Sequence, residues 1–187
     1  MTIAVSRRLL RYDVDLEFAH DDGFGWLDIT HGLTTARAAR WAWRAHPSAA
    51  TVRQALWAVW LCHDTGRAER RHGIADETDV TPVAGDVETL IRRGDVEAAL
   101  GAVRAAGTGA HRVLVDAALA DRAGSFIVMA HLIKLTKAAI EESLATGSDL
   151  PVLAATRLLA APRAERFVTG AVTESLAFVR TGRPPIR

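Results

Sequence analysis

Apolar residues recur at spacings of three and four along most of the chain, which is the pattern of amphipathic α-helices. Few stretches alternate strictly, as a half-buried strand would, and no repeat of about 34 or 40 residues is present. The pattern predicts an all-α fold, a single domain over residues 1–187 with about eight helices in orthogonal or bundle-like packing. The expected helices span residues 31–45, 49–63, 82–93, 96–106, 110–121, 125–145, 149–160 and 162–181.

Residues that begin and end helices divide these segments. Thr30 and Ser48 are expected N-caps, and Thr81-Pro82 and Asp95 begin later helices. Glycines are expected to end several helices, with Gly66 closing the second one. Residues 1–29 are expected to be partly irregular, residues 67–80 to form a polar surface loop, and residues 183–187 to be a frayed tail.

The segment 30–67 is predicted to fold back on itself at Pro47 as a helical hairpin. His31 and His63 are equally far from Pro47, so arms of equal length would bring His63 and Asp64 back to the level of His31. His63 continues an apolar stripe through Val52, Leu56 and Val59 and is therefore expected to point inward. His31 heads a line of small residues and is expected at a helix N-terminus, where the dipole favours a neutral imidazole.

Two further features belong to the expected interior. His131 shares a stripe with Val128, Leu135 and Ala138 on the longest predicted helix and is expected to point inward too. Large aromatic residues crowd the hairpin and are expected to pack in the core rather than to form a cofactor box; they are Trp41, Trp43, Trp57 and Trp60.

Composition narrows the function classes. Of 187 residues 49% are apolar and 24% charged, and the net charge is +1, which argues against a general nucleic-acid binder. Cys62 is the single cysteine, so the chain has no disulfide framework and no cysteine-rich metal site, and its buried thiol is expected to be inert. No apolar run approaches the roughly 18 residues of a membrane span, and we expect a cytoplasmic protein that does not bind membranes.

The order His31, His63-Asp64 and Asp116, with the apolar run LWAVWLCHDTGR before and through the His-Asp pair, resembles the HD superfamily of metal-dependent enzymes. This resemblance implies a divalent metal held by these four residues, which would activate water for attack on a phosphoester. Phosphate recognition would recruit cations near such a site, for which the candidates are Arg67, Arg70, Arg71 and Lys134. Asp121 competes with Asp116 for the last position, and the further histidines of two-metal members are missing after the His-Asp pair.

A second likeness extends over more of the chain. Four runs are similar to helical regions found beside Rieske iron–sulfur modules and, more loosely, to questin-oxidase-like proteins: GWLDITHGLTTARAARWAW, GDVEAALGAVRAAG, AHLIKLTKAAIEE and LAATRLLAAPRAERFVTGAVTESLAFV. This likeness implies redox chemistry on a small molecule. The chain has no Rieske Cys-x-His pairs, so an iron–sulfur or other electron-transfer centre would belong to a partner.

Three hypotheses for the site follow. In an oxidoreductase, His31, His63 and His131, with Asp64 or Glu141 as the carboxylate, hold a non-haem iron that activates O₂ beside a pocket for an apolar organic molecule. In a phosphohydrolase, His31, His63, Asp64 and Asp116 hold Mn, Co or Zn, with Asp64, Arg67 and Lys134 taking part in catalysis. In the third, the histidines are hydrogen-bonded core residues and the chain is a non-catalytic ligand-binding module or a partner of a redox system.

We place the oxidoreductase with iron first and the phosphohydrolase second. The sequence leaves open the metal and its count, the substrate and the oligomeric state. A centre at the predicted position requires that His63→Ala removes most of the bound metal.

Overall fold

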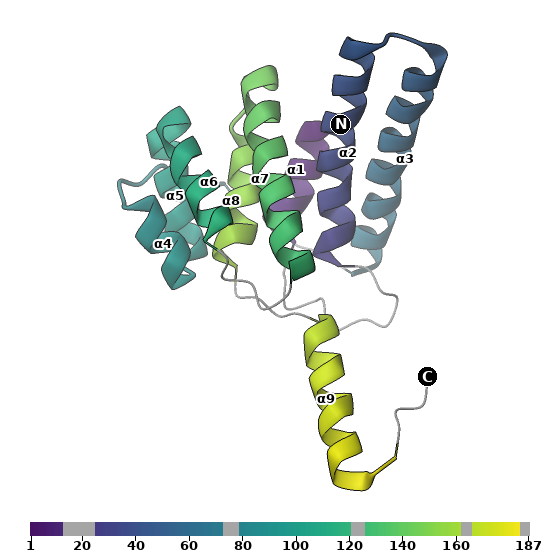
Figure 1. Ribbon diagram of the computed structural model, residues 1–187. Helices are drawn as coiled ribbons and strands as arrows, with labels where there is room; N and C mark the ends of the chain where they lie inside the picture. Colours follow the sequence, from purple (N-terminus) through teal and green to yellow (C-terminus); the bar gives the residue numbers. More distant parts are fainter. Residues whose placement is uncertain (13–24, 73–78, 121–125, 162–165, 184–187) are drawn as a thin grey trace.

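The computed structural model describes residues 1–12, 25–72, 79–120, 126–161 and 166–183 (Figure 1). Within these ranges the chain is helical without any strand, which confirms the all-α prediction. None of the described helices is both long and apolar enough to cross a membrane. The elements are α1 (Thr2–Arg11), α2 (Trp26–Ala45), α3 (Ala49–His72), α4 (Val87–Arg93), α5 (Val96–Ala106), the short 3₁₀ helix η2 (Gly107–Gly109), α6 (Ala110–Leu119), α7 (Phe126–Thr146), α8 (Leu150–Ala160) and α9 (Arg166–Thr181).

Helix α8 is the centre of the packed body. Its sequence is apolar on all sides, and such a helix is stable only when neighbours surround it. Residues 151–156 and 158–160 are all buried, and α8 packs against α1, α4, α5, α6 and α7. Arg157, its one charged residue, donates from Nε and Nη2 to the carbonyl oxygen of Tyr12 at 3.0 and 2.8 Å, which fixes the end of α1 on α8.

Helices α1, α2 and α7 are joined by a buried carboxylate. Glu142 of α7 is 2% exposed and accepts hydrogen bonds from Thr2 Oγ1 at 2.9 Å and from Arg40 Nη2 at 2.5 Å. On the same side, Arg37 of α2 pairs with Glu141. The later residue of α2, Arg40, pairs with the later residue of α7, Glu142, so the two helices run side by side in the same direction. The first halves of α2 and α7 therefore also lie together, at the site described below.

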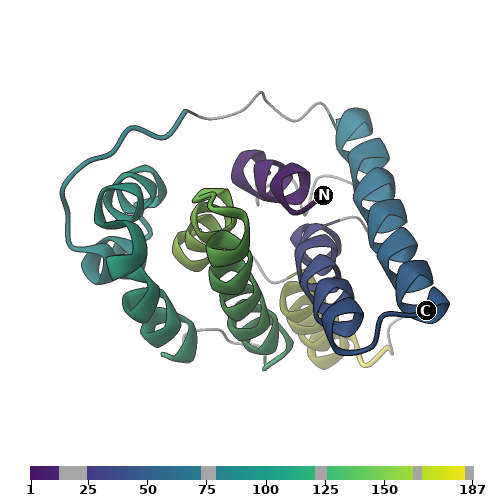
Figure 2. The same cartoon turned by 90° about the horizontal axis from the view of Figure 1, so that it is seen from above.

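The predicted hairpin is confirmed: α2 and α3 pack against each other and turn at Pro47 (Figure 2). Ser48 caps α3 as expected, because its Oγ accepts from Thr51 N at 3.3 Å while Thr51 Oγ1 accepts from Ser48 N at 3.0 Å. Gly66 does not end the helix, which continues to His72. The Arg8 guanidinium lies where a Cβ on Gly66 would be, so this glycine admits a side chain from α1 instead of breaking the helix.

The prediction for the buried face of α3 was wrong. Val52, Leu56 and Val59 are 44%, 62% and 54% exposed, and His63 is exposed with them. The buried face of α3 consists of smaller residues at seven-residue spacing, Thr51, Ala58 and Thr65. Small side chains let two helix backbones come close, so α3 packs on α2 through this seam and its large apolar residues remain outside.

The four hairpin tryptophans are not core residues either. Trp41, Trp43, Trp57 and Trp60 are 64%, 46%, 62% and 52% exposed, whereas Trp26, at the start of α2, is 7% exposed. The hairpin extends along the outer side of the body, where α3 has α2 on its inner side and no other described helix on its outer side (Figure 2). The outer side of α3 therefore has no described helix to pack against, while Trp41 and Trp57 line a groove between α2 and α3.

Several helix ends differ from their predicted positions. The first eleven residues, assigned to no element from sequence, include α1, and α2 begins at Trp26 rather than after Thr30. Helix α4 begins at Val87 instead of Pro82, because the preceding segment is held extended on α5 by a bond from Val83 N to Gly101 O of 3.1 Å. The boundaries of α5, α7 and α8 agree with the predictions to within a residue or two. Three predictions fall on residues that the structure does not describe. They concern Asp121 as a ligand, Pro162 as the start of the last helix, and residues 184–187 of the expected tail.

Candidate functional site

His31 of α2 and His131 of α7 meet where the two helices run side by side. Their Nε2 atoms are 3.0 Å apart, and the ring centroids are 5.1 Å apart with the planes at 62°. Both side chains are half-buried. His131 shares a face of α7 with the buried residues Val128 and Leu135, so the prediction that it points inward is confirmed.

The hydrogen bonds of His131 determine which of its nitrogens is free to bind. Its Nδ1 is 2.7 Å from the carbonyl oxygen of Ile127, and since a carbonyl can only accept, Nδ1 carries the proton. In the neutral ring the lone pair is therefore on Nε2, directed at His31. A backbone carbonyl behind a histidine ligand is the usual way in which proteins fix the tautomer and orientation of that ligand.

The pKa of His31 is lowered from its ordinary value. Burial is the main cause, the positive charge of Lys134 and the proximity of His131 add to it, and Asp28 opposes it. The helix-dipole argument from sequence does not apply, because α2 begins at Trp26 and places His31 in its second turn. Burial and the charged neighbours thus favour the neutral form of His31, and Lys134, predicted to belong to the site, lies close enough to contribute.

Trp26 forms one wall of the pair and was missed from sequence. Its ring meets that of His131 edge to face, with centroids 6.3 Å apart and planes at 90°. Gly25 and Asp28 fix it there, since Asp28 Oδ2 accepts from Gly25 N at 2.9 Å and closes the first turn of α2. An acidic residue three positions after an N-cap is the sequence signal for a helix start, and Asp28 stands three residues after Gly25. Thr30 was predicted as the N-cap instead, without use of this signal.

The remaining predicted ligands are elsewhere. His63, Asp64 and Arg67 are exposed on α3, and Asp116 is exposed on α6, where it accepts from Arg112 Nε at 2.9 Å. Over the ranges that the structure describes, no three residues among His, Cys, Asp and Glu gather as a metal-binding group. Of the five predicted ligands, the structure brings together His31 and His131 alone.

Glu141, the other carboxylate considered for the oxidative site, is engaged by cations further along α7. Hydrogen bonds from Arg37 and then Lys137 lower the pKa of Glu141 to about 2. Its Oε1 is 2.6 Å from Lys137 Nζ. As it lies nearly three helical turns beyond His131, it takes part in the contact between α2 and α7 and not in the histidine pair.

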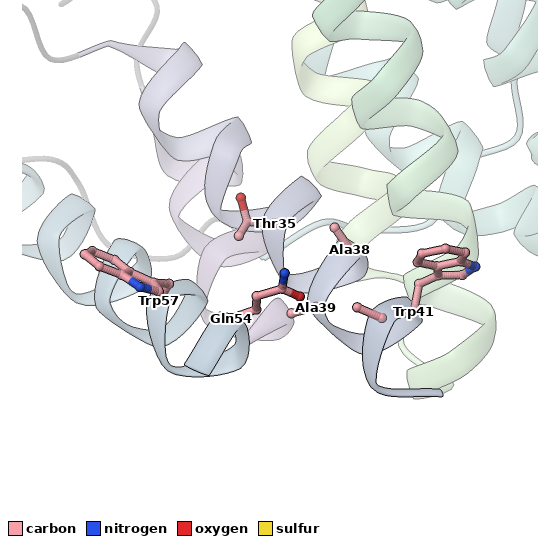
Figure 3. A pocket seen from close by; sticks show the side chains of 7 residues that line it. Thr35, Ala38, Ala39, Trp41, Gln54 and Trp57 are labelled. Carbon is pink, nitrogen blue, oxygen red and sulfur yellow. The ribbon is translucent and has the colours of Figure 1, made fainter. Parts of the chain in front are cut away.

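A groove of about 420 Å³ begins one helical turn beyond His31. It lies between α2 and α3, and Figure 3 shows Trp41 and Trp57 at its two ends with Thr35, Ala38, Ala39 and Gln54 between them. The line of small residues that His31 heads consists of Thr35, Ala38 and Ala42, and all three line this groove. The line of small residues therefore runs from the histidine pair into an apolar groove.

The distance between the two histidines matches that of two ligands on one metal. Two nitrogens at about 2.0–2.1 Å from one metal, in adjacent positions of an octahedron, are about 2.9 Å apart. The observed 3.0 Å separation of the Nε2 atoms fits that arrangement, and it equally fits a hydrogen bond from His31 to His131. The distance alone therefore agrees with a hydrogen-bonded pair and with two ligands of one metal.

No protein-family model matches the sequence, and no curated protein or solved structure matches it either. The resemblances to the HD superfamily and to questin-oxidase-like proteins remain predictions.

Proposed function

We propose that this chain is a metal-dependent oxidoreductase in which His31 and His131 hold a divalent metal beside a groove for an apolar organic molecule. The observation that carries the proposal is the 3.0 Å approach of two Nε2 atoms, one of which belongs to a ring whose other nitrogen is fixed by Ile127. Two imidazole ligands with an incomplete protein shell suit iron, and also Mn, Co or Zn.

The residues around the histidine pair each support metal binding in a different way. Ile127 O orients His131, and burial together with the charge of Lys134 keeps the pKa of His31 low, which favours the neutral, metal-binding form of the His31 ring. The buried Trp26 packs edge to face against the His131 ring and supports its orientation. The Lys134 ammonium adds a positive charge beside the pair, which favours an anionic group on the bound substrate.

When bound, iron would supply the O₂ chemistry that amino-acid side chains lack. In an oxygenase, one oxygen atom of O₂ enters the substrate and the other leaves as water, with two electrons and two protons supplied from outside. A chain with one cysteine holds no cysteine-ligated iron–sulfur cluster, so a separate electron-transfer protein would provide the electrons.

The groove supports the choice of substrate. It is lined by alanines and two indole rings, with Thr35 and Gln54 as its neutral polar groups, and it has no charged lining residue. Such a lining suits a flat apolar or aromatic molecule better than a nucleotide, whose phosphates require cations. The hydrolytic alternative requires His63, Asp64 and Asp116 beside His31, and their exposed positions give it no support.

The test begins with metal binding. The chain, purified without chelator, is analysed for bound metals and titrated with Fe²⁺ under argon, and separately with Co²⁺ to follow the ligand-field spectrum. We expect about one metal per chain, and a loss of roughly tenfold or more in affinity in both His31→Ala and His131→Ala. His63→Ala is the matched control, because this exposed histidine is expected to leave metal binding unchanged, contrary to the expectation from sequence.

Full metal occupancy in His31→Ala or in His131→Ala would contradict the proposed site, provided that circular dichroism shows the variant to be folded. O₂ consumption by the iron form with an apolar aromatic substrate supports oxidation, and phosphate release by the Mn, Co or Zn form would show a phosphohydrolase instead. A chain that binds none of these metals would contradict the proposed centre and support the non-catalytic module. Ala38→Leu fills the groove and should weaken substrate binding while metal binding is retained.

A further inference from the structure

Helices α6 and α7 enclose a cavity that is separate from the groove between α2 and α3. Its volume is about 350 Å³, and eight residues of the two helices line it. Five of the eight are apolar, among them Leu119 and Ile133 at its mouth, which are 55% and 37% exposed, and Ala118 at its floor, which is 3% exposed. A concave and mainly apolar pocket with a few polar groups is the usual form of a small-molecule site.

The cavity and the histidine pair lie on different sides of α7. The α7 residues of the cavity are spaced as one helix face; they are Ile133, Thr136, Lys137, Ile140 and Glu141. At about 100° per residue, the middle of this face is turned roughly half a circle away from His131. The cavity is therefore not part of the proposed metal centre.

Two of the three polar residues in the lining are paired with each other. Lys137 Nζ is 2.6 Å from Glu141 Oε1, and the other carboxylate oxygen of Glu141 accepts from Arg37 of α2. The charges of Lys137 and Glu141 are opposite, so the lining has no net charge. A neutral ligand would leave this pair intact, whereas an ion would have to compete with it.

Thr136 is the third polar residue, and within the described part of the chain its hydroxyl has no hydrogen-bond partner. The residue is 1% exposed. Other helical threonines of this chain donate to the carbonyl oxygen four residues earlier: Thr156 Oγ1 is 2.7 Å from Val152 O, and Thr34 and Thr146 make the same bond. A buried hydroxyl without a partner costs free energy, so an unpaired hydroxyl in the wall of an apolar cavity indicates that a ligand supplies the missing partner.

We propose that this cavity binds a neutral, mainly apolar small molecule with one hydroxyl or carbonyl oxygen, and that the Thr136 hydroxyl forms a hydrogen bond with that oxygen. A threonine hydroxyl can donate to either group. An apolar protein cavity of about 150 Å³ holds one benzene molecule, so a cavity of about 350 Å³ has room for roughly two fused rings. This inference does not depend on the metal centre or on the groove between α2 and α3.

Two probes of the same shape test the role of the hydroxyl. They are 2-naphthol and naphthalene, which differ by one oxygen atom. Each is titrated into the metal-free wild-type chain and into Thr136→Val, a change that removes the hydroxyl and keeps the shape of the side chain. We expect 2-naphthol to bind the wild-type chain with a Kd of roughly 10–100 µM and naphthalene to bind about tenfold more weakly. In Thr136→Val the two affinities should become equal, because the oxygen of 2-naphthol then has no partner.

Methyl NMR spectra locate the bound probe. In the wild-type chain 2-naphthol should shift the methyl resonances of Ile133 and Ile140, which line the cavity. Val115→Phe fills the cavity from α6 and should abolish these shifts, with circular dichroism to show that the variant is folded. Ala38→Leu is the matched control, because it fills the groove between α2 and α3 and should leave the shifts unchanged.

The stability of the free protein gives a readout that requires no ligand. Thr136→Val removes an unpaired buried hydroxyl, so the midpoint of thermal unfolding should rise by roughly 2–4 °C. Thr156→Val is the control for this measurement. Thr156 is fully buried too, but its hydroxyl is bonded to Val152 O, so its removal should not raise the midpoint.

Tighter binding of 2-naphthol that is lost in Thr136→Val and in Val115→Phe would support the proposed site. No saturable binding of 2-naphthol below about 1 mM would overturn it, and so would shifts confined to α2 and α3. Equal affinities of the two probes for the wild-type chain would exclude Thr136 as the binding group. A lower unfolding midpoint in Thr136→Val would exclude it as well, since the hydroxyl would then be paired in the free protein.

Discussion

Arg40 of α2 and Glu142 of α7 form an ion pair inside the protein, with 2.5 Å between Nη2 and Oε1 and with the Glu142 side chain 3% exposed. The same carboxylate accepts from Thr2, so one side chain connects three helices. Two of these helices carry His31 and His131. The distance between the proposed ligands therefore depends on a charged contact about three helical turns away from them.

Removal of the Glu142 carboxylate should destabilise the fold. Glu142→Ala leaves the Arg40 guanidinium and the Thr2 hydroxyl without their partner in a buried environment, and we expect a loss of about 2–3 kcal/mol in the free energy of unfolding. Urea unfolding measures it. Lys137→Ala, which breaks an exposed pair with Glu141 on the same helix, should cost only about 0.3–0.5 kcal/mol, and an equal loss in both variants would show that burial does not matter here.

The pKa of Glu141 makes stability depend on pH in the acid range. It is lowered from 4.5 to about 2 by Arg37 and Lys137, so the folded state holds the carboxylate charged where the unfolded chain protonates it. The resulting stabilisation is fully present above about pH 4.5 and is lost as the pH falls toward 2. The midpoint of thermal unfolding should therefore be higher for the wild-type chain than for Glu141→Gln at pH 6, and the difference should shrink between these pH values. A difference that stays constant down to pH 2.5 would contradict the lowered pKa.

The pKa of His31 should rise when Lys134 is removed. Burial, the Lys134 charge and His131 lower it together, so in Lys134→Ala the His31 ring should titrate at a higher pH, closer to 6.5. NMR titration of the imidazole protons in the metal-free chain measures the change. Lys137→Ala serves as the comparison, because that ammonium is paired with Glu141 one turn further along α7 and should leave the His31 titration unchanged.

The lowered His31 pKa also predicts the direction of a stability change. An unfolded chain binds a proton at this ring near pH 6.5, whereas the folded chain binds it only at lower pH. The contribution of the neutral ring is thus present above pH 6.5 and is lost as the pH falls through the folded-state pKa. His31→Gln should reduce this part of the pH dependence, as measured by urea unfolding between pH 7.5 and 5. An unchanged pH profile in the variant would contradict it.

Gly101 should not tolerate a methyl group. A Cβ at this position would lie 2.7 Å from the carbonyl oxygen of Thr81, in the extended segment that crosses α5. Gly101→Ala must displace that backbone, and we expect a loss of about 1–3 kcal/mol in urea unfolding. Gly109→Ala is the control: a Cβ on Gly109 would meet no atom within 4 Å and its φ is −61°, so this change should be neutral or stabilising by about 0.4–1 kcal/mol. Equal effects at both glycines would rule out the close approach as the cause.

Local signals in the sequence located most of the helices. Ser48 and Asp95 cap where they were expected, Gly94 and Gly147 adopt positive φ at helix ends, and Asp95 Oδ1 accepts from Ala98 N. Gly66 carried the same local signal as these glycines, but the Arg8 side chain of α1 occupies its free side and α3 continues. A contact across about 60 residues of sequence is invisible to a rule that considers only neighbouring residues.

Helical periodicity correctly predicted that one residue of the histidine pair, His131, points inward. The stripe through Val128 and Leu135 correctly placed His131 on an inward face, while the equally regular stripe through Val52 and Leu56 placed His63 on the wrong one. The two cases differ in the surroundings of the helix: α7 has α2, α6 and α8 beside it, whereas α3 packs mainly on α2. A helix with neighbours on several sides buries its large apolar face, and a helix at the edge can bury a smaller one.

The sequence by itself determined the helices from α2 onward, many of their ends, and the hairpin around Pro47, because these features depend on residues within a turn or two of each other; α1 was not predicted. Only the tertiary structure decided that α3 packs on α2 through Thr51, Ala58 and Thr65, that His31 meets His131 instead of His63, and that the large apolar residues of α3 are left exposed. The physical reason is that helical periodicity defines which side chains share a face, whereas the choice of the face that is buried depends on how closely two backbones can approach and on which helices are present to cover it.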